Sequence, residues 1–327
     1  MLKNSTFART RALIVGSVAF DLIFGIHGKI QDEILVEKDG KLGRQNLMFT
    51  AKSREHFFGG TGGNIAYGLG LLKQKPLLFS LAGQDFDLPA RNRTQAGGSG
   101  FLSHLEKAGV DSRVVVDEKG WTATFYGMSD ELGQQIGVYQ PNAYEKVHTV
   151  PLSKTVLATD FKNIGVAIFS AGTGMSILRH MKETREKCGK DTLIIFDPGQ
   201  VISIFYDKTL LEQTLALADI FIGNEVEIKQ LQTILGYSIE KVLEKGMRAV
   251  IETLGEKGSV IYEDGKTTRV NAVKAKKVVE ATGAGDAYRA GMIAQLLQGK
   301  NLKDACTFGA KIASLSVGSR GGQNYRI

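Results

Sequence analysis

A glycine-rich loop near the C-terminus leads directly into a helical pattern and ends on a carboxylate. The loop is Glu280-Ala-Thr-Gly-Ala-Gly-Asp286, and residues 287–297 after it place apolar side chains on one helix face. The free N–H groups and the dipole of a helix N-terminus favour an anion. Asp286 could accept the proton of a hydroxyl group that attacks phosphorus, although Asp is also a common helix cap. Phosphate oxygens could approach the backbone at the small residues of the loop, which are Gly283, Ala284 and Gly285.

Two other phosphate-binding motifs do not fit the sequence. Tyr288 stands where the third glycine of a dinucleotide-binding fingerprint is required. The segment Gly265-Lys-Thr267 looks like the end of a Walker A motif, but Val260 occupies the position of its first glycine. Asp264-Gly265 is better explained as the turn of a β-hairpin.

Polar residues near the N-terminus have the chemistry of a site for a polyol. Asp21 follows an apolar run, Ala12–Val18, and its carboxylate could accept hydrogen bonds from two neighbouring hydroxyl groups. Asn64 follows Gly59-Gly-Thr-Gly-Gly63 and precedes a helical pattern, Ile65–Leu72, and its amide offers both a donor and an acceptor. The structural alternatives are a turn residue at Asp21 and a helix cap at Asn64.

Short apolar runs along the chain alternate with helical patterns, mainly after residue 160. Buried strands that alternate with helices are typical of a mainly parallel sheet with helices on both faces. The expected fold class is therefore α/β, with a doubly wound sheet. The expected strands are Ala12–Val18, Pro76–Ala82, Gly165–Ala171, Thr192–Asp197, Asp219–Asn224, Ala249–Leu254 and Ser259–Glu263. The expected helices after residue 160 are Met175–Lys187, Lys208–Ala218, Val226–Leu235 and Ile239–Gly246.

Two segments, about residues 23–58 and 114–148, instead alternate polar with apolar side chains, as in Trp121-Thr-Ala-Thr-Phe-Tyr126. Such alternation is typical of half-exposed antiparallel strands. We interpret the two segments as a small inserted sheet that forms a lid over a cleft within a single domain, 1–327. The alternative is an extension at the edge of the main sheet.

The composition bears on the binding partners and the cellular location that can be expected. The formal net charge is +7 and the sequence pI is about 9.2, but no run of five basic residues suggests a nucleic-acid arm. A nucleotide, or no charged partner at all, accounts for this excess equally well. Cys188 and Cys306 form neither a disulfide framework nor a zinc pattern, and no apolar stretch has the length of a membrane span. We therefore expect a cytoplasmic protein without nucleic-acid or membrane partners.

Taken in order along the chain, these segments resemble the signature motifs of the ribokinase/PfkB family of carbohydrate kinases. Gly59–Asn64 is similar to the first signature, and Gly283–Asp286 is similar to the second, which supplies an anion hole and a catalytic aspartate. Asn224-Glu-Val-Glu227 resembles the family's NxxE motif, whose glutamate organises Mg²⁺ and phosphates, usually through water. Thr253-Leu-Gly-Glu-Lys-Gly258 is similar to its nucleotide-binding turn. The resemblance runs from about residue 12 to the end of the sequence.

The resemblance implies a role for each matched position, and it implies ATP and Mg²⁺ as cofactors. Positions similar to those that hold ribose hydroxyl groups are Ser17, Asp21, Gly60 and Asn64. The implied ATP-binding residues are Asn224, Glu227, Thr253, Gly255 and Gly258, and Glu227 is also the implied Mg²⁺ residue, through water. The family usually has Asp-Thr where this chain has Glu280-Ala281, and this departure leaves activation by K⁺ open.

Three segments are most similar to the bacterial adenosine kinases within the family. They are Asp197-Pro-Gly-Gln200, Asp286-Ala-Tyr-Arg-Ala-Gly291 and the tail Ser319–Asn324, and the first adds Gln200 as a candidate substrate-binding residue. The implied reaction is ATP-dependent phosphorylation of adenosine to AMP, with Asp286 as the general base. The alternatives are a kinase of a free sugar, such as ribose or fructose, and a relative that binds nucleotide or sugar without turnover.

The lid segments carry aromatic and apolar side chains that suggest two further functions. One aromatic residue could stack on a purine, and the candidates are Phe57, Phe58, Trp121, Phe125, Tyr126 and Tyr139. A thin sheet cannot bury all of its apolar side chains by itself, so one face could form the interface of a two-fold symmetric homodimer, as lid sheets of this family often do. The side chains expected on that face include Ile34, Leu47, Phe49, Phe125, Ile136 and Val138.

Overall fold

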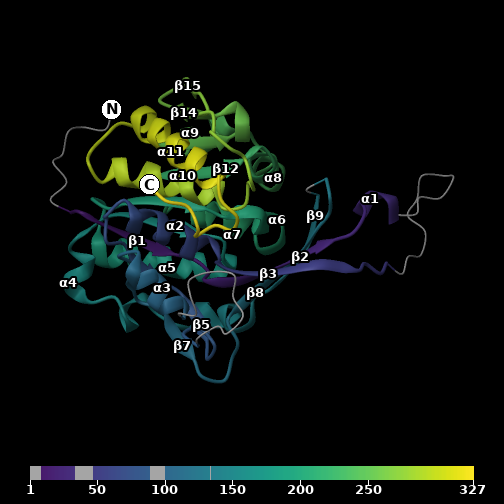
Figure 1. The fold of residues 1–327 in the computed structure, drawn as a ribbon. Helices are drawn as coiled ribbons and strands as arrows, with labels where there is room; N and C mark the ends of the chain where they lie inside the picture. Colours follow the sequence, from purple (N-terminus) through teal and green to yellow (C-terminus); the bar gives the residue numbers. More distant parts are fainter. Residues whose placement is uncertain (1–8, 34–46, 89–99, 133) are drawn as a thin grey trace.

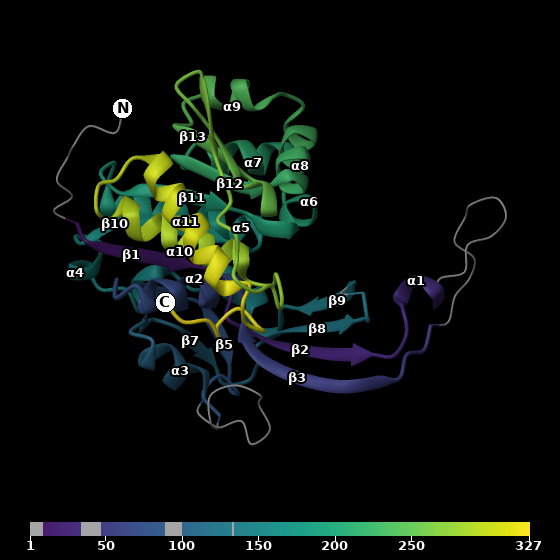
Figure 2. The ribbon, with the colours of Figure 1, turned by 45° about the horizontal axis from the view of Figure 1, so that its top comes forward.

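A nine-stranded sheet forms the centre of the protein (Figures 1 and 2). The structure is a computed structural model that describes residues 9–33, 47–88, 100–132 and 134–327. Neighbouring strands are parallel from β6 to β13, and only the β13–β14–β15 edge is antiparallel. In order across the sheet, the strands are β15 (Lys266–Val270), β14 (Ser259–Glu263), β13 (Ala249–Thr253), β12 (Ile220–Asn224), β11 (Leu193–Asp197), β10 (Ile164–Ser170), β1 (Arg11–Val15), β4 (Leu77–Phe79) and β6 (Asp111–Ser112).

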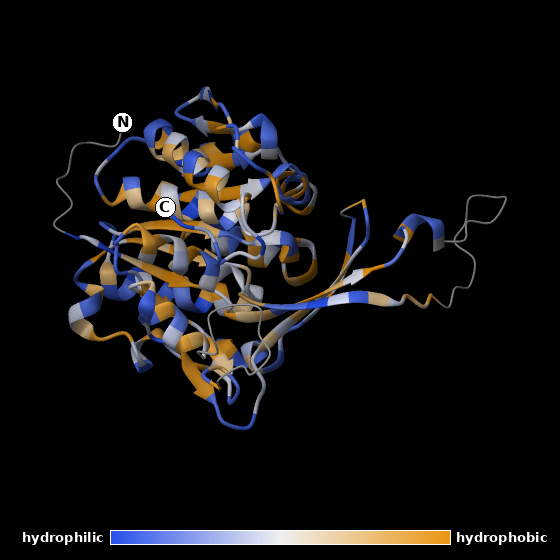
Figure 3. Cartoon of the chain, in the orientation of Figure 1, coloured by the Kyte–Doolittle hydropathy of each residue, from blue (hydrophilic) through white to orange (hydrophobic). Residues whose placement is uncertain are grey.

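Helices cover both faces of this sheet, which confirms the doubly wound α/β fold. Alternate residues of β1 enter two cores, with Ala12 and Ile14 in one and Leu13 and Val15 in the other. The first core is closed by α2 (Thr61–Leu71), α3 (Phe101–Lys107), α10 (Ala284–Leu296) and α11 (Leu302–Ser316). The second is closed by α4 (Ala158–Phe161), α5 (Gly174–Cys188), α6 (Ile202–Phe205), α7 (Lys208–Leu215), α8 (Glu225–Leu235) and α9 (Ile239–Glu244). Figure 3 shows hydrophobic residues along the strands between these helices.

A second sheet of four strands projects from this body, with the short helix α1 (Ile30–Glu33) at its far end (Figures 1 and 2). Its strands, in order, are β3 (Ala51–Gly59), β2 (Ala19–Ile26), β8 (Ala123–Ser129) and β9 (Gln135–Gln140). The expected small sheet is therefore present. The expectation that its strands are antiparallel is wrong for the central pair, because β2 and β8 run parallel. Both of these strands leave the body in the outward direction, and β3 and β9 return (Figure 2).

The register of this lid sheet separates its two faces. Asp21 is paired with Phe57 and Phe125, and Phe125 is paired with Tyr139, so these four side chains share a face, which we call the inner face.

Strand residues one position away point to the opposite, outer face of the lid. Tyr126 and Val138 form one pair there, and Met128 and Ile136 form another. The expectation that Phe125 shares a face with Ile136 and Val138 is therefore wrong, because pairing places Phe125 one residue out of phase with them. Ile34, which was expected on the same face, lies outside the described residues.

Two local expectations have different outcomes. Residues 76–82 form two strands instead of one, since β5 (Leu81–Gly83) leaves the main sheet and pairs with β7 (Val115–Asp117). Asp264 and Gly265 both have positive φ, at 48° and 68°, which confirms the tight hairpin turn between β14 and β15.

In the part of the chain that the structure describes, no helix is both long and apolar enough to span a membrane.

Candidate functional site

Asp286 lies in the first turn of α10, at the end of the glycine-rich loop. The helix begins at Ala284 and its cap is Gly283, which has a left-handed φ of 78° and lacks a capping side chain. Asp286 is therefore not the capping residue. Its Oδ2 accepts a hydrogen bond of 2.8 Å from Nδ2 of Asn64. Burial raises the pKa of Asp286 to about 7, while the positive charge of Arg289 and the bond from Asn64 oppose the rise.

The backbone of the loop carries N–H groups beside this carboxylate. The N–H group of Ala284 donates to the carbonyl oxygen of Ala281 at 3.1 Å, so it already has a partner. Gly285 and Asp286 follow it in the first turn, where N–H groups lack partners within the helix. Of the expected anion hole, these two N–H groups are the ones best placed to bind phosphate oxygens.

The residues expected to hold an acceptor surround the start of β2 and of α2. Asp21 is half-buried within β2, so it is not a turn residue. Burial and the negative charges of Asp286 and Glu280 raise its pKa to about 7. Ser17 is buried, and its carbonyl oxygen accepts from the N–H of Gly63 at 3.0 Å.

Asn64 connects this acceptor side to the loop that carries Asp286. The helix α2 begins at Thr61 after Gly60, its cap, so Asn64 lies within the helix and is not its cap. The side chain is buried and bonds to Asp286, although the two residues are far apart in the sequence. This single hydrogen bond brings together the two glycine-rich segments that the sequence singled out.

A buried ion pair lies beside the glycine-rich loop that leads to Asp286, and it was not expected from the sequence. Arg289 of α10 is 5% exposed and Asp197, at the end of β11, is 3% exposed. Nη2 of Arg289 donates to Oδ1 of Asp197 at 2.7 Å, and its Nε lies 2.5 Å from Oδ2. Nη1 donates to the carbonyl oxygen of Gly285 at 3.0 Å, which ties the ion pair to the loop. Gln200 follows on the next turn and is exposed.

The segment Asn224–Glu227 forms the N-terminus of α8. The two oxygens of Glu227 accept from the backbone N–H of Asn224 at 2.8 Å and from its Nδ2 at 3.0 Å. Oδ1 of Asn224 in turn accepts from the N–H groups of Val226 and Glu227. This is a capping box, so the spacing has a structural function whatever else it does. Burial and the charge of Asp197 raise the pKa of Glu227, while the charge of Arg289 opposes the rise.

The expected nucleotide-binding turn lies beside Asn224, because Asn224 and Thr253 are paired in neighbouring strands. Oγ1 of Thr253 donates to the carbonyl oxygen of Gly223 at 3.4 Å. The turn closes through the N–H of Leu254, which donates to the carbonyl oxygen of Gly258 at 2.8 Å. Gly258 has a φ of 91°, and a Cβ there would stand 2.0 Å from the carbonyl oxygen of Val270, so only glycine fits.

The side chains of this site fit a metal ion that is held mainly by nucleotide phosphates and water. Across the described ranges, no group of three or more His, Cys, Asp or Glu side chains could hold one. Mg²⁺ bound to nucleotide phosphates needs only one or two carboxylates and keeps several waters. Glu227, whose carboxylate is buried near Asp197 and Arg289, fits such a contact through water.

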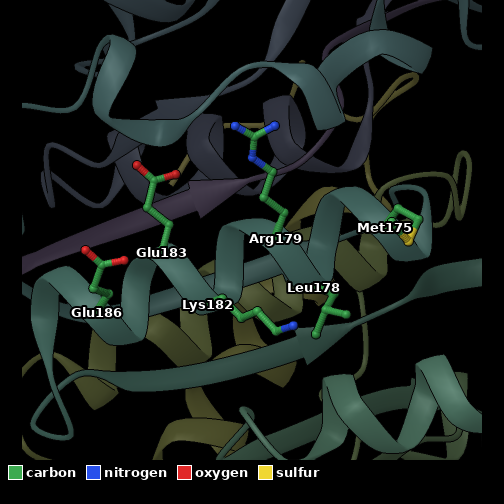
Figure 4. Close-up of a pocket in the computed structure, with 6 residues that line it drawn as sticks. All are labelled: Met175, Leu178, Arg179, Lys182, Glu183 and Glu186. Atoms are coloured by element: carbon green, nitrogen blue, oxygen red, sulfur yellow. The ribbon is translucent and has the colours of Figure 1, made fainter.

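Two other features lie outside this arrangement. The depression lined by Met175, Arg179 and Glu183 follows the surface of α5 and contains none of the expected site residues (Figure 4). Glu183 there accepts from the N–H groups of Leu152 and Ser153, which is a structural task. At the tail, Oε2 of Glu280 accepts from the N–H of Gly321 at 3.1 Å.

The residues that the sequence did not assign are Arg289 and Gln323. Arg289 belongs to the segment that begins at Asp286, and Gln323 belongs to the C-terminal tail. Membership of a motif does not show which residue a side chain contacts. Gln323 is fully buried and donates to Oδ1 of Asn64 at 3.0 Å. The signal available in the sequence was a polar side chain within each motif, but a sequence does not show that such a side chain is buried and therefore requires a partner.

Known proteins are similar to this chain over most of its length. A profile described as pfkB family carbohydrate kinase matches residues 29–326. A nucleoside kinase of Methanothermobacter thermautotrophicus is 30% identical over 315 residues, which is 95% of this chain and 90% of that protein. A nucleoside kinase of Methanocaldococcus jannaschii is 28% identical over 314 residues, or 94% and 91% of the two chains. The solved structure of Burkholderia thailandensis nucleoside kinase in complex with inosine has a TM-score of 0.78 and 27% identity, and covers 96% of this chain and 93% of that one. This chain therefore belongs to the pfkB family of carbohydrate kinases and is an ATP-dependent kinase, as its sequence motifs indicated.

Proposed function

We propose that this protein, as a single kinase domain with a lid, transfers the γ-phosphate of ATP to a hydroxyl group of a nucleoside, with adenosine as the preferred acceptor. The observation that carries the proposal is the 2.8 Å hydrogen bond from Asn64 to Asp286. The bond places Asn64, whose amide can bind sugar hydroxyl groups, next to Asp286, whose carboxylate can accept a proton. A purely structural pair would not need to lie beside a helix N-terminus that can bind phosphate.

In this mechanism, Asp21 and Asn64 hold the ribose so that one hydroxyl group faces Asp286. The carboxylate of Asp286 takes the proton as the hydroxyl oxygen forms a bond to the γ-phosphorus, and the bond to the β–γ bridging oxygen breaks, releasing ADP. The N–H groups of Gly285 and Asp286 stabilise the negative charge on the transferred group. Glu227 would hold Mg²⁺ through water, and the bound ion would neutralise charge on the phosphates.

On the nucleotide side, Asn224, Thr253, Gly255 and Gly258 would form the ATP-binding surface. The two cysteines, Cys188 and Cys306, are free and buried, which supports a reducing, cytoplasmic location. The rate with and without added K⁺ decides whether Glu280-Ala281 still permits activation by that ion.

Two observations favour a nucleoside over a free sugar. Two relatives similar over most of this chain are named nucleoside kinases, and the Burkholderia protein binds inosine. Tyr139 also lies on the inner face of the lid, paired with Phe125. Its hydroxyl group is close to Ser17 and Asp21, while the residue as a whole remains 41% exposed. Of the aromatic candidates, Tyr139 is therefore the best placed to cover a base.

The other aromatic candidates have less suitable positions. Phe57 and Phe58 are buried, at 4% and 0% exposure. Tyr126 lies on the outer face, and Trp121 precedes β8. Phe125 shares the inner face but packs against Gly137, where a Cβ would stand 2.2 Å from its ring.

A single screen tests the proposed function. Purified protein is incubated with ATP and Mg²⁺ and a panel of nucleosides and free sugars, and ADP formation is measured. We expect adenosine to give the highest kcat/KM, with inosine and other nucleosides above ribose and fructose. A higher kcat/KM for a free sugar would favour the alternative function, and no turnover with any acceptor would indicate a binding protein.

Asp21→Ala is expected to raise the KM for the acceptor about 10- to 100-fold, because hydrogen bonds from the acceptor to a carboxylate are lost. The KM for ATP should stay nearly unchanged, since Asp21 lies on the acceptor side. Steady-state kinetics with each substrate varied in turn measures both values. Asp32→Ala, the same change at an exposed position of α1, serves as the control. A raised KM for ATP with an unchanged KM for the acceptor would show that Asp21 lies on the nucleotide side of the site and not on the acceptor side.

The outer face of the lid supports a two-fold symmetric homodimer. It exposes Tyr126, Ile136 and Val138 at 40%, 39% and 64%, which is unusual for one side of a small sheet. We expect light scattering at micromolar concentration to give twice the mass of the 35.5 kDa chain. Val138→Glu should give the monomer mass, because a charge would be placed in the apolar interface. A monomeric wild type with full activity would show that the lid acts alone.

A further inference from the structure

The C-terminal tail passes between the two halves of the proposed site. A Cβ on Gly322 would stand 2.6 Å from Nδ2 of Asn64, and a Cβ on Gly283 would stand 2.7 Å from the Cα of Gly322. Further along, the side chain of Tyr325 is 1% exposed, and its carbonyl oxygen accepts from the hydroxyl group of Tyr67 at 3.3 Å. The tail is therefore packed in place, in contact with both α2 and the glycine-rich loop that leads to Asp286.

Gln323, between these anchors, has an amide whose orientation is fixed by the backbone. Its Nε2 donates to the carbonyl oxygen of Gly59 at 3.4 Å and to Oδ1 of Asn64 at 3.0 Å. A backbone carbonyl can only accept, so the atom of Gln323 that faces Gly59 must be the nitrogen. The atom of Asn64 that faces this nitrogen must then be its oxygen. The NH₂ group of Asn64 is consequently left to donate to Oδ2 of Asp286.

The alternative orientation of Asn64 would place an acceptor against an acceptor. If its amide turned by half a rotation, Oδ1 would face the carboxylate of Asp286, and the Asn64–Asp286 hydrogen bond would be lost. The two ends of an amide have nearly the same size, so packing alone opposes this rotation weakly. The Asp286 carboxylate itself disfavours the rotation, and the bond from Gln323 to Oδ1 adds to that preference and holds the amide from its other end.

We propose that Gln323 is a positioning residue for phosphoryl transfer, which acts through Asn64 to hold the Asp286 carboxylate in place, a role that rests on the proposed function of Asp286 and Asn64. One hydrogen bond runs from Gln323 in the tail to Asn64 in α2, and a second runs from Asn64 to Asp286 in the first turn of α10. Gln323 itself touches neither substrate nor the reacting atoms in this arrangement.

A double-mutant cycle between Gln323 and Asn64 tests the proposal. Gln323→Met, Asn64→Ala and the double variant are compared with the wild type, using adenosine and ATP in steady-state kinetics. We expect Gln323→Met to lower kcat about 2- to 10-fold, the range for one lost hydrogen bond between neutral groups, with the KM for ATP little changed. The double variant should be no slower than Asn64→Ala alone, because Gln323 acts only through Asn64.

Gln213→Met, the same substitution at an exposed position of α7, is the matched control and should behave as the wild type. If Gln323→Met does not fold, as judged by circular dichroism, the cycle is run with Gln323→Glu. That variant keeps the size of the side chain. Burial favours its neutral form, whose hydroxyl group can still donate to Asn64, so we expect a loss of kcat that grows as the pH rises and the carboxyl group ionises.

Three results would overturn the inference. They are a normal kcat in both Gln323 variants, a double variant whose loss is the product of the two single losses, and a rise in the KM for ATP that matches the fall in kcat. The last two would indicate that Gln323 only supports the fold. Asp286→Asn is assayed in the same experiment as a test of the proposed function itself. An active Asp286→Asn enzyme would refute that function. An inactive Asp286→Asn enzyme together with a normal Gln323→Met enzyme would refute only the role of Gln323.

Discussion

Replacing Asp286 with asparagine is expected to lower kcat by about two to four decades, the contribution typical of a general base. Asparagine keeps the size of the side chain and its amide oxygen can still accept from Asn64, so the local packing should persist. Its amide cannot take a proton from the attacking hydroxyl group. ATP binding should be largely retained, since the nucleotide is held by other residues. Steady-state kinetics and an ATP titration of the variant measure the two effects.

The matched control is Asp191→Asn, at a side chain that is 86% exposed, which should turn over like the wild type. Turnover of the Asp286 variant near the wild-type rate would show that this carboxylate has only a structural role, through its hydrogen bond with Asn64. Acidity provides a second check, because the pKa of Asp286 is about 7 and only its ionised form can act as a base. The kcat of the wild type, measured at saturating acceptor so that the titration of Asp21 in acceptor binding does not enter, should therefore fall as the pH drops below about 7. The residual kcat of the variant should not fall in this range.

Arg289→Met should destabilise the protein by about 3–5 kcal/mol, the cost of removing one partner from a buried ion pair. Asp197 would remain almost fully buried without its guanidinium partner. Burial already raises the pKa of Asp197 and Arg289 opposes this rise, so the pKa of Asp197 should climb further in the variant. Urea unfolding of the wild type and the variant at matched pH measures the difference.

The sign of the pH effect follows from proton binding. A carboxyl group whose pKa is higher in the folded than in the unfolded state holds its proton better when folded, so it stabilises the fold at low pH. The loss in Arg289→Met should therefore shrink as the pH falls toward the unfolded value of about 4. The double variant Asp197→Asn/Arg289→Met should recover part of the stability. Equal losses at pH 5 and pH 8 would contradict an unpaired charge as the cause.

The lid shows which parts of the fold the sequence could predict. The alternation of polar and apolar residues indicated a half-exposed sheet, because period two is a local property of the chain. The direction of β8 relative to β2 depends on where each strand leaves the body, and no local pattern contains that information. The same limit explains why Phe125 was expected on the face of Ile136 and Val138, since a shift of one residue in pairing exchanges the two faces.

In the candidate site, the sequence likewise indicates individual residues but not which residues they contact. Asp286 and Asn64 could be proposed individually, because each stands at a glycine-rich turn into a helix. Their mutual hydrogen bond joins segments separated by 222 positions, and the partner of Arg289 is 92 positions away. Residue types name the chemistry that a side chain can perform, but partners over such distances are set by the crossover connections of the sheet. Gln323 remained unassigned for this reason, although its motif was visible.

The position of β1 in the sheet has a consequence for how the protein reaches its native state. This strand lies between β10 and β4, and it pairs Leu13 with Ala167 from the middle of the chain. By contrast, β10 to β13 are neighbours in the sheet in the same order as in the chain. Contacts between distant segments must close a large loop before they contribute energy, so they form slowly. Refolding should therefore be limited by the insertion of β1, and the acceptor side of the site, which follows directly from this strand, should be among the last regions to assemble.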